Sequence, residues 1–356
     1  MAYDIIGDIH GQADKLHALL GKMGYVQRQG AYRHPNRTAI FVGDFIDRGP
    51  KQVESVMTAR RMVEAGSALA VMGNHEFNAM AWHTEDPDRP GHYLRPRSGA
   101  LGANNRAQHQ AFLNEVEGDC SLHADLMDWF YTLPLWLDLP DLRVVHACWH
   151  AGYMETLRPW LTDDNCLTPA ALVAASRSGH PVFQAAEGLT KGLEIPLPAP
   201  YSFHDKDGHV RHSVRIRWWD ETATRYRDLA MLSDDLRCQV PDVEVPASQS
   251  VTYDGLKPAG LKAARMGALR DEAGQVQIDA RGDEGSDERA DHADQELDEQ
   301  RVVATQHDVG DPAGQDADHR RREYAHAAHC FLRPASPKTP VSRTNPRRRH
   351  AEPQKH

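Results

Sequence analysis

The chain has 356 residues with a formal net charge of −10 at pH 7, and it carries five cysteines at irregular spacing. The negative charge gives no footprint for general nucleic-acid binding, and the cysteine spacing indicates neither a disulfide framework nor a zinc site. No apolar run approaches the roughly 20 residues of a membrane span, so we expect a cytoplasmic protein without a membrane partner. No heptad pattern indicates an oligomer, and a monomer is the default expectation.

Three apolar runs near the N-terminus predict short buried strands, and each run ends in a polar string that contains glycine. The amphipathic segments at 13–25 and 53–65 predict helices between these strands, so the chain alternates strand and helix as α/β folds do. Open α/β sheets carry their chemistry at the carboxyl ends of the strands, which predicts one common site for the three strings. The runs and strings are 3–6 with GDIHG, 38–42 with GDFIDRG, and 68–72 with GNHE.

The three strings supply donor atoms that suit a metal ion. Asp8 and His10 stand in the first string, Asp44 in the second and Asn74 in the third. Any one of these strings alone is typical of an ordinary turn, because turns favour Gly, Asp and Asn. Their recurrence at three strand ends instead indicates a metal centre. Carboxylate and amide oxygens mixed with imidazole nitrogen suit Mn²⁺ or Fe better than Mg²⁺ alone.

Together these strings resemble the signature of the calcineurin-like metallophosphoesterases. The DRG of the second string resembles the phosphoprotein phosphatase branch of that family, which includes bacterial serine/threonine phosphatases and diadenosine tetraphosphatases. The resemblance is specific over residues 1–80, extends to about residue 255 and is absent beyond it. It implies an α/β fold built as a layered β-sandwich flanked by helices, with two divalent metal ions at its centre.

The resemblance implies a metal-binding role for residues of all three strings. Asp8 and His10 would hold the first ion, Asp44 would bridge the two ions, and Asn74 would bind the second. A bridging carboxylate offsets the repulsion between two cations about 3.5–4 Å apart and fixes a shared water, whose lowered pKa makes it a nucleophile at neutral pH.

A further histidine ligand is expected where a later strand ends. The apolar run at 139–147 closes on His146, which is the expected ligand of the second ion. His150 would compete for this role if the segment were helical. The β-branched residues Val144 and Val145 instead favour a strand followed by a loop.

Catalytic roles follow from the same resemblance. His75 would act as the general acid on the leaving-group oxygen, and Asp47 would orient the imidazole of His75 through a hydrogen bond. Arg48 offers a planar fork of donors that suits the oxygens of a bound phosphate. A surface salt bridge is the alternative explanation of Arg48.

The stretch at 83–117 resembles a cap-like insertion. Its first part is rich in Pro, Gly and Arg, and its second part, at 104–116, predicts a helix, so that together they would cover the metal site. Arg95 and Arg97 are candidate substrate-binding residues there, because loops near a site tend to carry specificity. Solvated arginines in an ordinary loop are the alternative.

The composition changes abruptly near residue 258 and divides the chain into a metallophosphoesterase domain at 1–257 and a tail at 258–356. Charged and polar residues dominate the tail without an apolar period, which is typical of a disordered segment. The family also implies a last metal-ligand histidine in a Gly-His pair, and this pair is missing from the tail. A shift of the reading frame near 258–260 would explain both observations.

We therefore expect a metal-dependent phosphoesterase that hydrolyses a phosphomonoester or a phosphoanhydride by attack of a metal-bridging hydroxide. Its partner would be a phosphorylated protein, nucleotide or small molecule, and the sequence does not choose among these. The alternative is a catalytically impaired remnant that binds phosphate or metal, because the last ligand histidine is missing. Loss of the hydrogen-bond partner of a metal ligand typically lowers metal affinity or activity by roughly 10- to 100-fold. Loss of a ligand itself should lower them at least as much.

Overall fold

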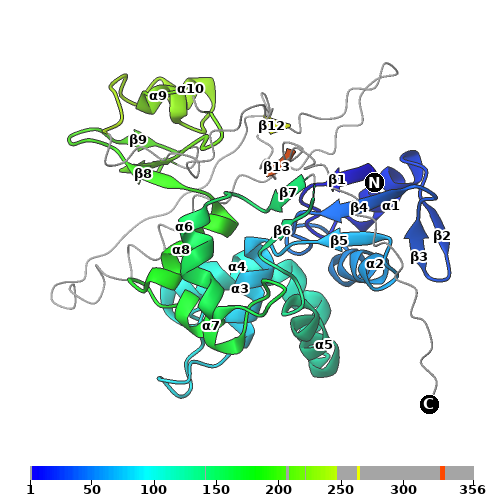
Figure 1. The fold of residues 1–356 in the computed structure, drawn as a ribbon. Helices are drawn as coiled ribbons and strands as arrows, with labels where there is room; N and C mark the ends of the chain where they lie inside the picture. The colour runs from blue at the N-terminus through cyan, green and yellow to red at the C-terminus, as the bar shows by residue number, and fades with distance from the viewer. Residues whose placement is uncertain are drawn as a thin grey trace, which may run out of the picture.

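The fold, obtained as a computed structural model, is a mixed α/β arrangement of two main sheets and surrounding helices (Figure 1). The predicted tail at 258–356 lies outside the described residues except for two short strands, and so does the predicted boundary after residue 257. The structure describes residues 2–140, 142–205, 208–220, 222–246, 263–264 and 329–332.

The first sheet is parallel, with its strands in the order β1-β4-β5. Ile6 at the end of β1 lies opposite Phe41, and Phe41 at the end of β4 lies opposite Ala70. Because the strands run in one direction and end level with one another, the residues that follow them are delivered to one edge of the sheet. The three predicted strands are confirmed as β1 (Ala2–Ile6), β4 (Arg37–Phe41) and β5 (Ala68–Ala70).

The second sheet is antiparallel, with its strands in the order β12-β13-β7-β6. β6 and β7 form a hairpin, and β13 pairs with the other edge of β7. An uncovered edge of β7 would expose unpaired backbone groups, and β13 supplies partners for them. The strands are β6 (Trp136–Asp138), β7 (Leu142–Val145), β12 (Ala263–Ala264) and β13 (His329–Leu332).

The two sheets pack against each other through a small apolar layer, which confirms the predicted sandwich. On β4, Ile40 faces this layer, while its neighbours Ala39 and Phe41 belong to a larger core on the opposite face. This is the alternation of side chains expected of a strand buried on both faces. The layer is formed by Ile40, Val42, Val71, Leu142 and Val144.

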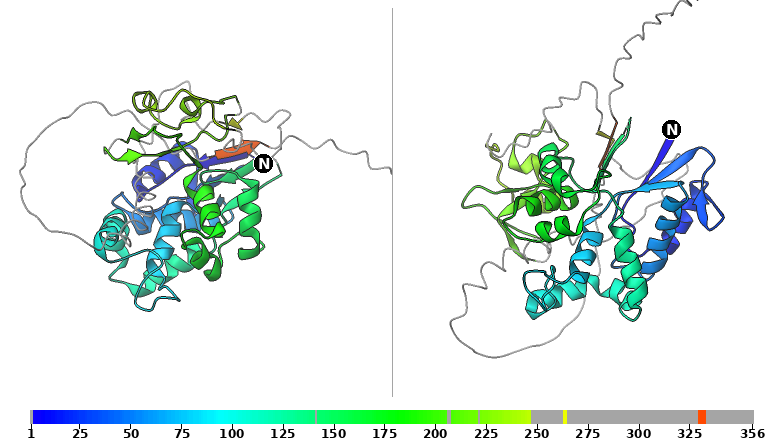
Figure 2. Two further views of the ribbon diagram at one scale, coloured as in Figure 1. Left: turned by 90° about the vertical axis from the view of Figure 1, so that its left-hand side faces the viewer. Right: turned by 60° about the horizontal axis from the view of Figure 1, so that its bottom comes forward.

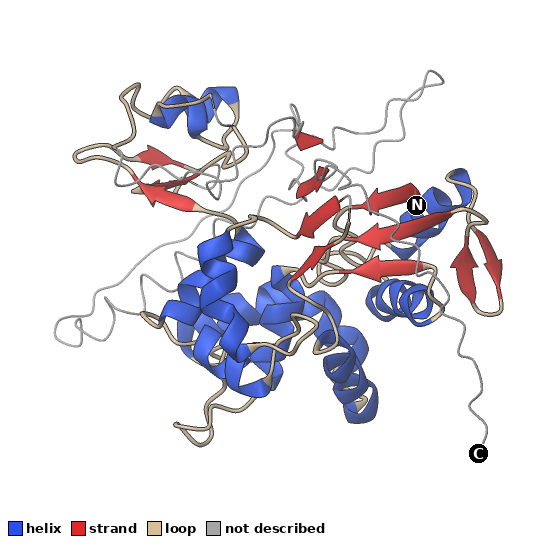
Figure 3. Ribbon diagram, viewed as in Figure 1, coloured by secondary structure: helices blue, strands red, loops and turns tan. Residues whose placement is uncertain are grey.

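Helices cover the outer face of the parallel sheet, and the predicted helices after β1 and β4 are present (Figure 3). α1 (Ala13–Lys22) buries Leu16 and Leu20, and α2 (Gln52–Glu64) buries Val56 and Met62 in the larger core. The spacing of these residues places them on one face of each helix. The apolar faces of both helices therefore pack against the outer face of the parallel sheet.

The remaining helices extend the larger core. Figure 2 shows, in its right view, that the helices from α6 to α10 lie on the opposite side of the sheets from α1 and α2. None of the described helices is both long enough and apolar enough to cross a membrane. The helices are α3 (Asn74–His83), α4 (Gly99–Val116), α5 (Cys120–Phe130), α6 (Ala151–Leu157), η1 (Arg158–Trp160), α7 (Pro169–Ala175), α8 (Pro181–Lys191), α9 (Tyr226–Leu229) and α10 (Asp234–Arg237). The short strands are β2 (Val26–Arg28), β3 (Ala31–Arg33), β8 (Glu194–Pro196), β9 (Phe203–His204), β10 (Val210–Arg211) and β11 (Ser213–Arg215).

Candidate metal centre

The polar residues that follow the parallel strands and β7 meet in one largely buried place. The shared edge of the parallel sheet delivers three of these segments, and the sandwich brings the end of β7 beside them. The residues brought together are Asp8 and His10 after β1, Asp44 after β4, Asn74 and His75 at the start of α3, and His146 after β7.

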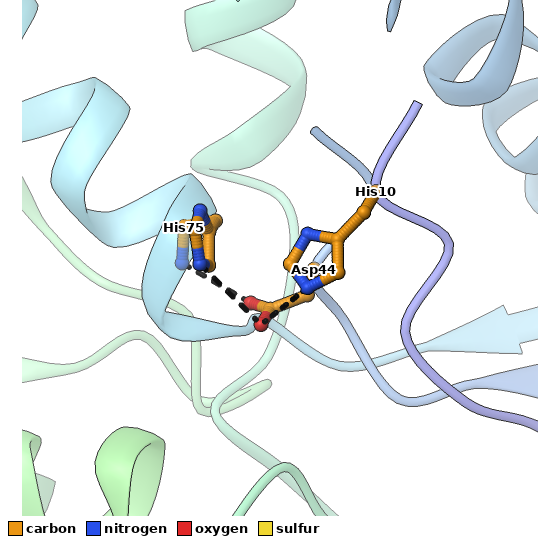
Figure 4. Close-up of side chains that lie close together, drawn as sticks. All are labelled: His10, Asp44 and His75. Carbon is orange, nitrogen blue, oxygen red and sulfur yellow. Dashed lines mark hydrogen bonds and ion pairs between the residues drawn. The ribbon is translucent and has the colours of Figure 1, made fainter. Parts of the chain in front are cut away.

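Asp44 is shared by two groups of potential metal ligands. One group adds His10 and His75 to Asp44, the other adds Asp8 and His146, and the ligand atoms of each group lie within 4.8 Å of one another. The Oδ2 atom of Asp44 lies 3.8 Å from His10 Nε2, 3.9 Å from His75 Nε2 and 3.5 Å from His146 Nε2. Figure 4 shows His10 and His75 turned toward this carboxylate from two elements. A carboxylate shared in this way is suited to bridge two cations.

The grouping differs in part from the expected one. The sequence paired Asp8 with His10 at the first ion, whereas the structure groups Asp8 with His146 and brings His75 into the group of His10. The two groups are close together, because His10 Nε2 also lies 3.8 Å from Asp8 Oδ2. Asp8 and His10 are therefore still near enough to share one ion.

Backbone hydrogen bonds turn the imidazole rings so that their Nε2 atoms face the ligand groups. His10 donates its Nδ1–H to the Ile46 carbonyl at 2.8 Å, and His146 donates its Nδ1–H to the Val42 carbonyl at 2.6 Å. In the neutral form of each ring, the Nε2 atom is thereby left as an acceptor. His10 Nε2 and Asp8 Oδ1 are buried without a hydrogen-bond partner. Buried acceptors of this kind are costly unless a ligand completes them, and the donor set fits a divalent ion.

The pKa values of these groups reflect their burial and the closeness of the carboxylates and imidazoles to one another. Burial and then the Asp44 carboxylate raise the pKa of Asp8 to about 6. Burial and then His75 lower the pKa of His10 to about 3. Burial also opposes ionisation of Asp44, but the surrounding histidines, His146 most strongly, outweigh it and hold the pKa of Asp44 below its usual value. Bound cations would favour both the ionised carboxylates and the neutral imidazoles.

The turns that present these side chains have unusual backbone conformations. His10, Asp44, Asp47 and Arg48 have φ values of 45°, 54°, 71° and 69°, in the left-handed region that glycine adopts most readily. Such conformations cost on the order of 1–3 kcal/mol each and cluster at functional sites. Gly73 is required by a close approach, since a Cβ atom there would lie 2.1 Å from Asp44 Oδ1.

Glu76 links the segments that follow β4 and β5 through hydrogen bonds. The sequence did not predict this role. Its Oε2 atom accepts the backbone N–H groups of Asp44 at 2.8 Å and Gly73 at 3.0 Å, and its Oε1 atom accepts that of Phe45 at 2.7 Å. The signal was present in the sequence, because a Glu at the third position of a helix is typical of a capping box.

Asp47 joins His75 to a second histidine from another helix. Asp47 Oδ2 lies 2.5 Å from His75 Nδ1, and Asp47 Oδ1 lies 2.7 Å from His109 Nδ1 in α4. Burial opposes ionisation of Asp47, but His109 and His75 outweigh it and hold the pKa of Asp47 below its usual value. The acceptor carboxylate keeps the protons on both Nδ1 atoms, so His75 presents Nε2 to the Asp44 side of the site.

A cleft lies beside the ligand groups. Arg48, Asn74, His75 and His146 line one wall of it, which is consistent with the expected phosphate-binding role of Arg48. The opposite wall comes from the end of α8 and from the chain that follows β8, rather than from the predicted cap at 83–117. The main residues of this opposite wall are Lys191, Gly192, Arg215, Trp218 and Trp219.

Arg95 and Arg97 do not line the cleft, although the sequence made them candidates for substrate binding. Arg95 Nη2 donates to Gln108 Oε1 at 2.7 Å. Arg97 donates to the Trp82 carbonyl, and its guanidinium lies 3.3 Å from the ring centroid of Tyr93. These contacts hold the segment before α4 against α3 and α4, which is a structural use of the two arginines.

The structure brings His146, and not His150, to the other potential metal ligands. His146 directly follows β7, as the strand prediction required, whereas His150 accepts the backbone N–H of Tyr153 at 3.1 Å and caps α6. A ring contact with Tyr153, with centroids 4.0 Å apart, further fixes His150 in this capping position.

A second pair of histidines, the buried His123 and the exposed His83, lies near the contact between Asp47 and His109. The ring centroids of His123 in α5 and His83 in α3 are 4.4 Å apart. Burial, and then the neighbouring His83 and His109, lower the pKa of His123 to about 4, with Arg97 acting in the same direction and Glu117 against it. The Nε2 atom of His123 is buried without a partner.

Replacing His123 by Leu should make the fold less sensitive to acid. The pKa of His123 falls from 6.5 to about 4 on folding, so between these values only the unfolded chain binds the proton and stability falls as pH falls. Between about pH 7.5 and about pH 5 the wild type should lose about 1–2 kcal/mol more unfolding free energy than His123→Leu, with solvent screening allowed for. Urea denaturation at the two pH values measures this difference, and equal losses would contradict the prediction.

Comparison with known proteins agrees with the predicted resemblance. Residues 1–168 match the family model described as calcineurin-like phosphoesterase. The chain is 46% identical over 76 residues to the asymmetrical bis(5'-nucleosyl)-tetraphosphatase PrpE of Halalkalibacterium halodurans. The aligned segment covers 21% of this chain and 31% of that protein. Over 150 residues it is 32% identical to the PrpE protein of the same name from Bacillus subtilis, which covers 41% of this chain and 57% of that protein.

Similarity to solved structures is weaker. A protein serine/threonine phosphatase from Saccharomyces cerevisiae aligns with a TM-score of 0.30 at 20% identity, covering 51% of this chain and 47% of that chain. Of the two PrpE proteins, the chain spans 31% of the length of the one from Halalkalibacterium halodurans and 57% of the one from Bacillus subtilis.

Proposed function

We propose that this chain, whose residues 1–168 match the calcineurin-like phosphoesterase family, is a metal-dependent hydrolase of phosphomonoester or phosphoanhydride bonds. The observation that carries the proposal is the sharing of Asp44 by two buried groups of ligand atoms at the wall of a cleft. A centre of this kind needs a substrate group with several anionic oxygens, which a phosphoryl group supplies.

Two divalent ions fit the donor set, and the residues that would hold them are Asp8, His10, Asp44, Asn74 and His146. Imidazole nitrogen mixed with carboxylate and amide oxygen favours Mn²⁺ or Fe over Mg²⁺. Such ions, when bound, would lower the pKa of a water molecule and so make it a nucleophile at neutral pH.

The other residues of this wall orient the substrate and move a proton. Arg48 offers paired donors to the oxygens of the phosphoryl group, where it would hold the group in line for attack. His75 would donate the proton on Nε2 to the leaving oxygen, and Asp47 would keep the ring in the orientation that makes this possible. Proton donation of this kind contributes typically about 10²- to 10⁴-fold to the rate.

The relatives are named for bis(5'-nucleosyl) tetraphosphates, and this supports a nucleotide as the substrate beside phosphoproteins and small phosphate esters. A cytoplasmic location and a monomeric state remain predictions.

One feature favours a second candidate, a remnant that binds metal or phosphate with little turnover. No Gly-His pair follows residue 257 in the sequence, so the last ligand implied by the family is missing. Translation of the other reading frames of the coding DNA past 258 tests the origin of this gap, because a frameshift predicts an apolar run ending in Gly-His there.

A metal-depletion experiment separates the two candidates. The purified full chain, stripped with EDTA, should be inactive on p-nitrophenyl phosphate, and added Mn²⁺ should restore hydrolysis. The measurement is the release of p-nitrophenol, with Mn²⁺ binding followed by calorimetry. Binding of Mn²⁺ without hydrolysis of p-nitrophenyl phosphate, ATP or a phosphopeptide would favour the remnant.

A further inference from the structure

The wall of the cleft opposite the metal ligands is not used by the proposed function. It is built by local pairing after α8, since β8 and β11 are antiparallel with Arg215 opposite Glu194. A Cβ atom on Gly192 would lie 3.3 Å from Arg215 Cδ, so this arginine packs across the glycine at the end of α8. Trp218 donates its Nε1–H to the Ala147 carbonyl at 2.9 Å and ties the wall to the end of β7.

Cationic side chains gather in the cleft from both walls. Arg48 comes from the metal side, and Lys191 and Arg215 come from the opposite side. The Lys191 side chain is 2% exposed and pairs with Glu187 at 2.8 Å, while Arg215 lies 3.8 Å from Glu194. Buried ion pairs seldom stabilise a fold more than apolar packing would. An ammonium group buried in the wall of this cleft is therefore better explained by an anionic ligand than by stability.

Trp219 adds a planar apolar surface next to these cations. Its ring is perpendicular to that of the buried Trp218, with centroids 5.9 Å apart, and it stays partly exposed in the cleft. An indole ring beside cationic groups is suited to stack on a nucleobase whatever the identity of the base.

We propose that Lys191, Arg215 and Trp219 form a subsite for the second phosphate and the base of a nucleoside polyphosphate. The subsite rests on the proposed function, because the first phosphate would be hydrolysed at the metal centre beside Arg48. It makes a phosphoanhydride a better substrate than a phosphomonoester, since a monoester has no second phosphate that could contact Lys191 and Arg215.

The reaction that this subsite supports is a balanced hydrolysis. Water forms a new bond from its oxygen to the terminal phosphorus, and the bond from that phosphorus to the bridging oxygen breaks. The bridging oxygen leaves with the shortened nucleotide, and the protons of water are shared between the two phosphate products. No oxidant or reductant is needed.

Binding of a non-hydrolysable probe tests the subsite directly. The probe is adenosine 5'-(β,γ-methylene)triphosphate, whose terminal P–C–P link cannot be hydrolysed, and its affinity for the full chain with Mn²⁺ is measured by calorimetry against that of inorganic phosphate. The wild type should bind the probe at least about tenfold more tightly than phosphate. Arg215→Ala and Trp219→Ala should each reduce this preference by about tenfold.

Arg217→Ala is the matched control. Arg217 lies two residues from Arg215, donates to the Asp228 carbonyl and does not line the cleft, so its loss should leave the preference for the probe unchanged. Circular dichroism checks that each variant is folded, and the wild-type comparison stands even if a variant does not fold.

The outcomes of the two proposals are distinguishable. A wild type that binds the probe no more tightly than phosphate overturns the subsite, and so does an unchanged preference in both folded variants. If the wild type hydrolyses p-nitrophenyl phosphate but shows no binding preference for the probe, the subsite is contradicted and the proposed hydrolase function stands. If the wild type prefers the probe but hydrolyses no substrate, the subsite stands and the proposed hydrolase function is contradicted.

Discussion

Asp44→Asn should lower Mn²⁺-dependent hydrolysis of p-nitrophenyl phosphate at least about 100-fold, because loss of a ligand's hydrogen-bond partner already costs up to that much. Asp44 is the one residue shared by both ligand groups among the described residues, and its Oδ2 atom faces three imidazole rings. The amide that replaces it keeps the shape of the side chain and removes the negative charge. Hydrolysis rate and the number of bound Mn²⁺ ions per chain are measured together, and both should fall.

The matched control for this variant is Asp14→Asn in α1. The Asp14 side chain is 73% exposed and forms a surface pair with Lys51, so its loss should leave both rate and ion binding unchanged. If Asp44→Asn keeps the wild-type rate and its full complement of ions, the shared carboxylate does not hold the metal centre together.

The location of the candidate metal centre was predictable because it depends on the ends of strands. Apolar runs that stop at GDIHG, GDFIDRG and GNHE identify parallel strands, and parallel strands in register must deliver Asp8, Asp44 and Asn74 to one edge. His146 was predictable for the same reason, since Val144 and Val145 favour the strand that precedes it. Short-range pattern and the geometry of a sheet are sufficient for this part of the site.

The opposite wall of the cleft was not predictable, because no local pattern connects it to the metal ligands. Lys191 ends a helix, and Arg215 and Trp219 lie in and after a short strand more than a hundred residues from the first strings. Each reads as an ordinary helix or strand residue. Only the pairing of β8 with β11 and the contact of Trp218 with the residue after His146 bring them to the cleft.

The predicted cap shows how composition can mislead. A loop rich in Pro, Gly and Arg beside a metal site favoured substrate binding by Arg95 and Arg97, but their donors are directed to Gln108 and to the Trp82 carbonyl. The part of this stretch that does reach the site is the buried helix α4, which brings His109 to Asp47. A separation of 62 residues between these two partners leaves no signal in the sequence.

Asp47 thus has a hydrogen-bond partner on each of its two oxygens, and this bears on the proposed role of His75 in proton transfer. A carboxylate with one partner can rotate about its side chain, whereas a carboxylate fixed by His75 on one oxygen and His109 on the other has one orientation. We infer that His109 is a positioning residue, which acts on the reaction only through Asp47 and His75.

His75→Asn should slow the hydrolysis of phenyl phosphate by about 10²- to 10⁴-fold, the usual contribution of a general acid. The loss should be smaller for p-nitrophenyl phosphate, whose leaving group is a more stable anion and needs less help from a proton. The ratio of the two losses, measured as kcat for each substrate, separates proton donation from a general loss of structure. Equal losses on the two substrates would contradict the role of His75 as an acid.

His109→Leu should reproduce the same dependence on the leaving group at a smaller size, about 10- to 100-fold on phenyl phosphate. Leu fills the space of the ring but cannot donate to Asp47, whereas His109→Asn retains an N–H donor and should recover much of the rate. The low-field NMR signal of the His75 Nδ1 proton gives a reading that does not depend on turnover, and it should shift in His109→Leu more than in His109→Asn. A leucine variant with the wild-type leaving-group dependence and an unshifted proton would show that Asp47 keeps its orientation without His109.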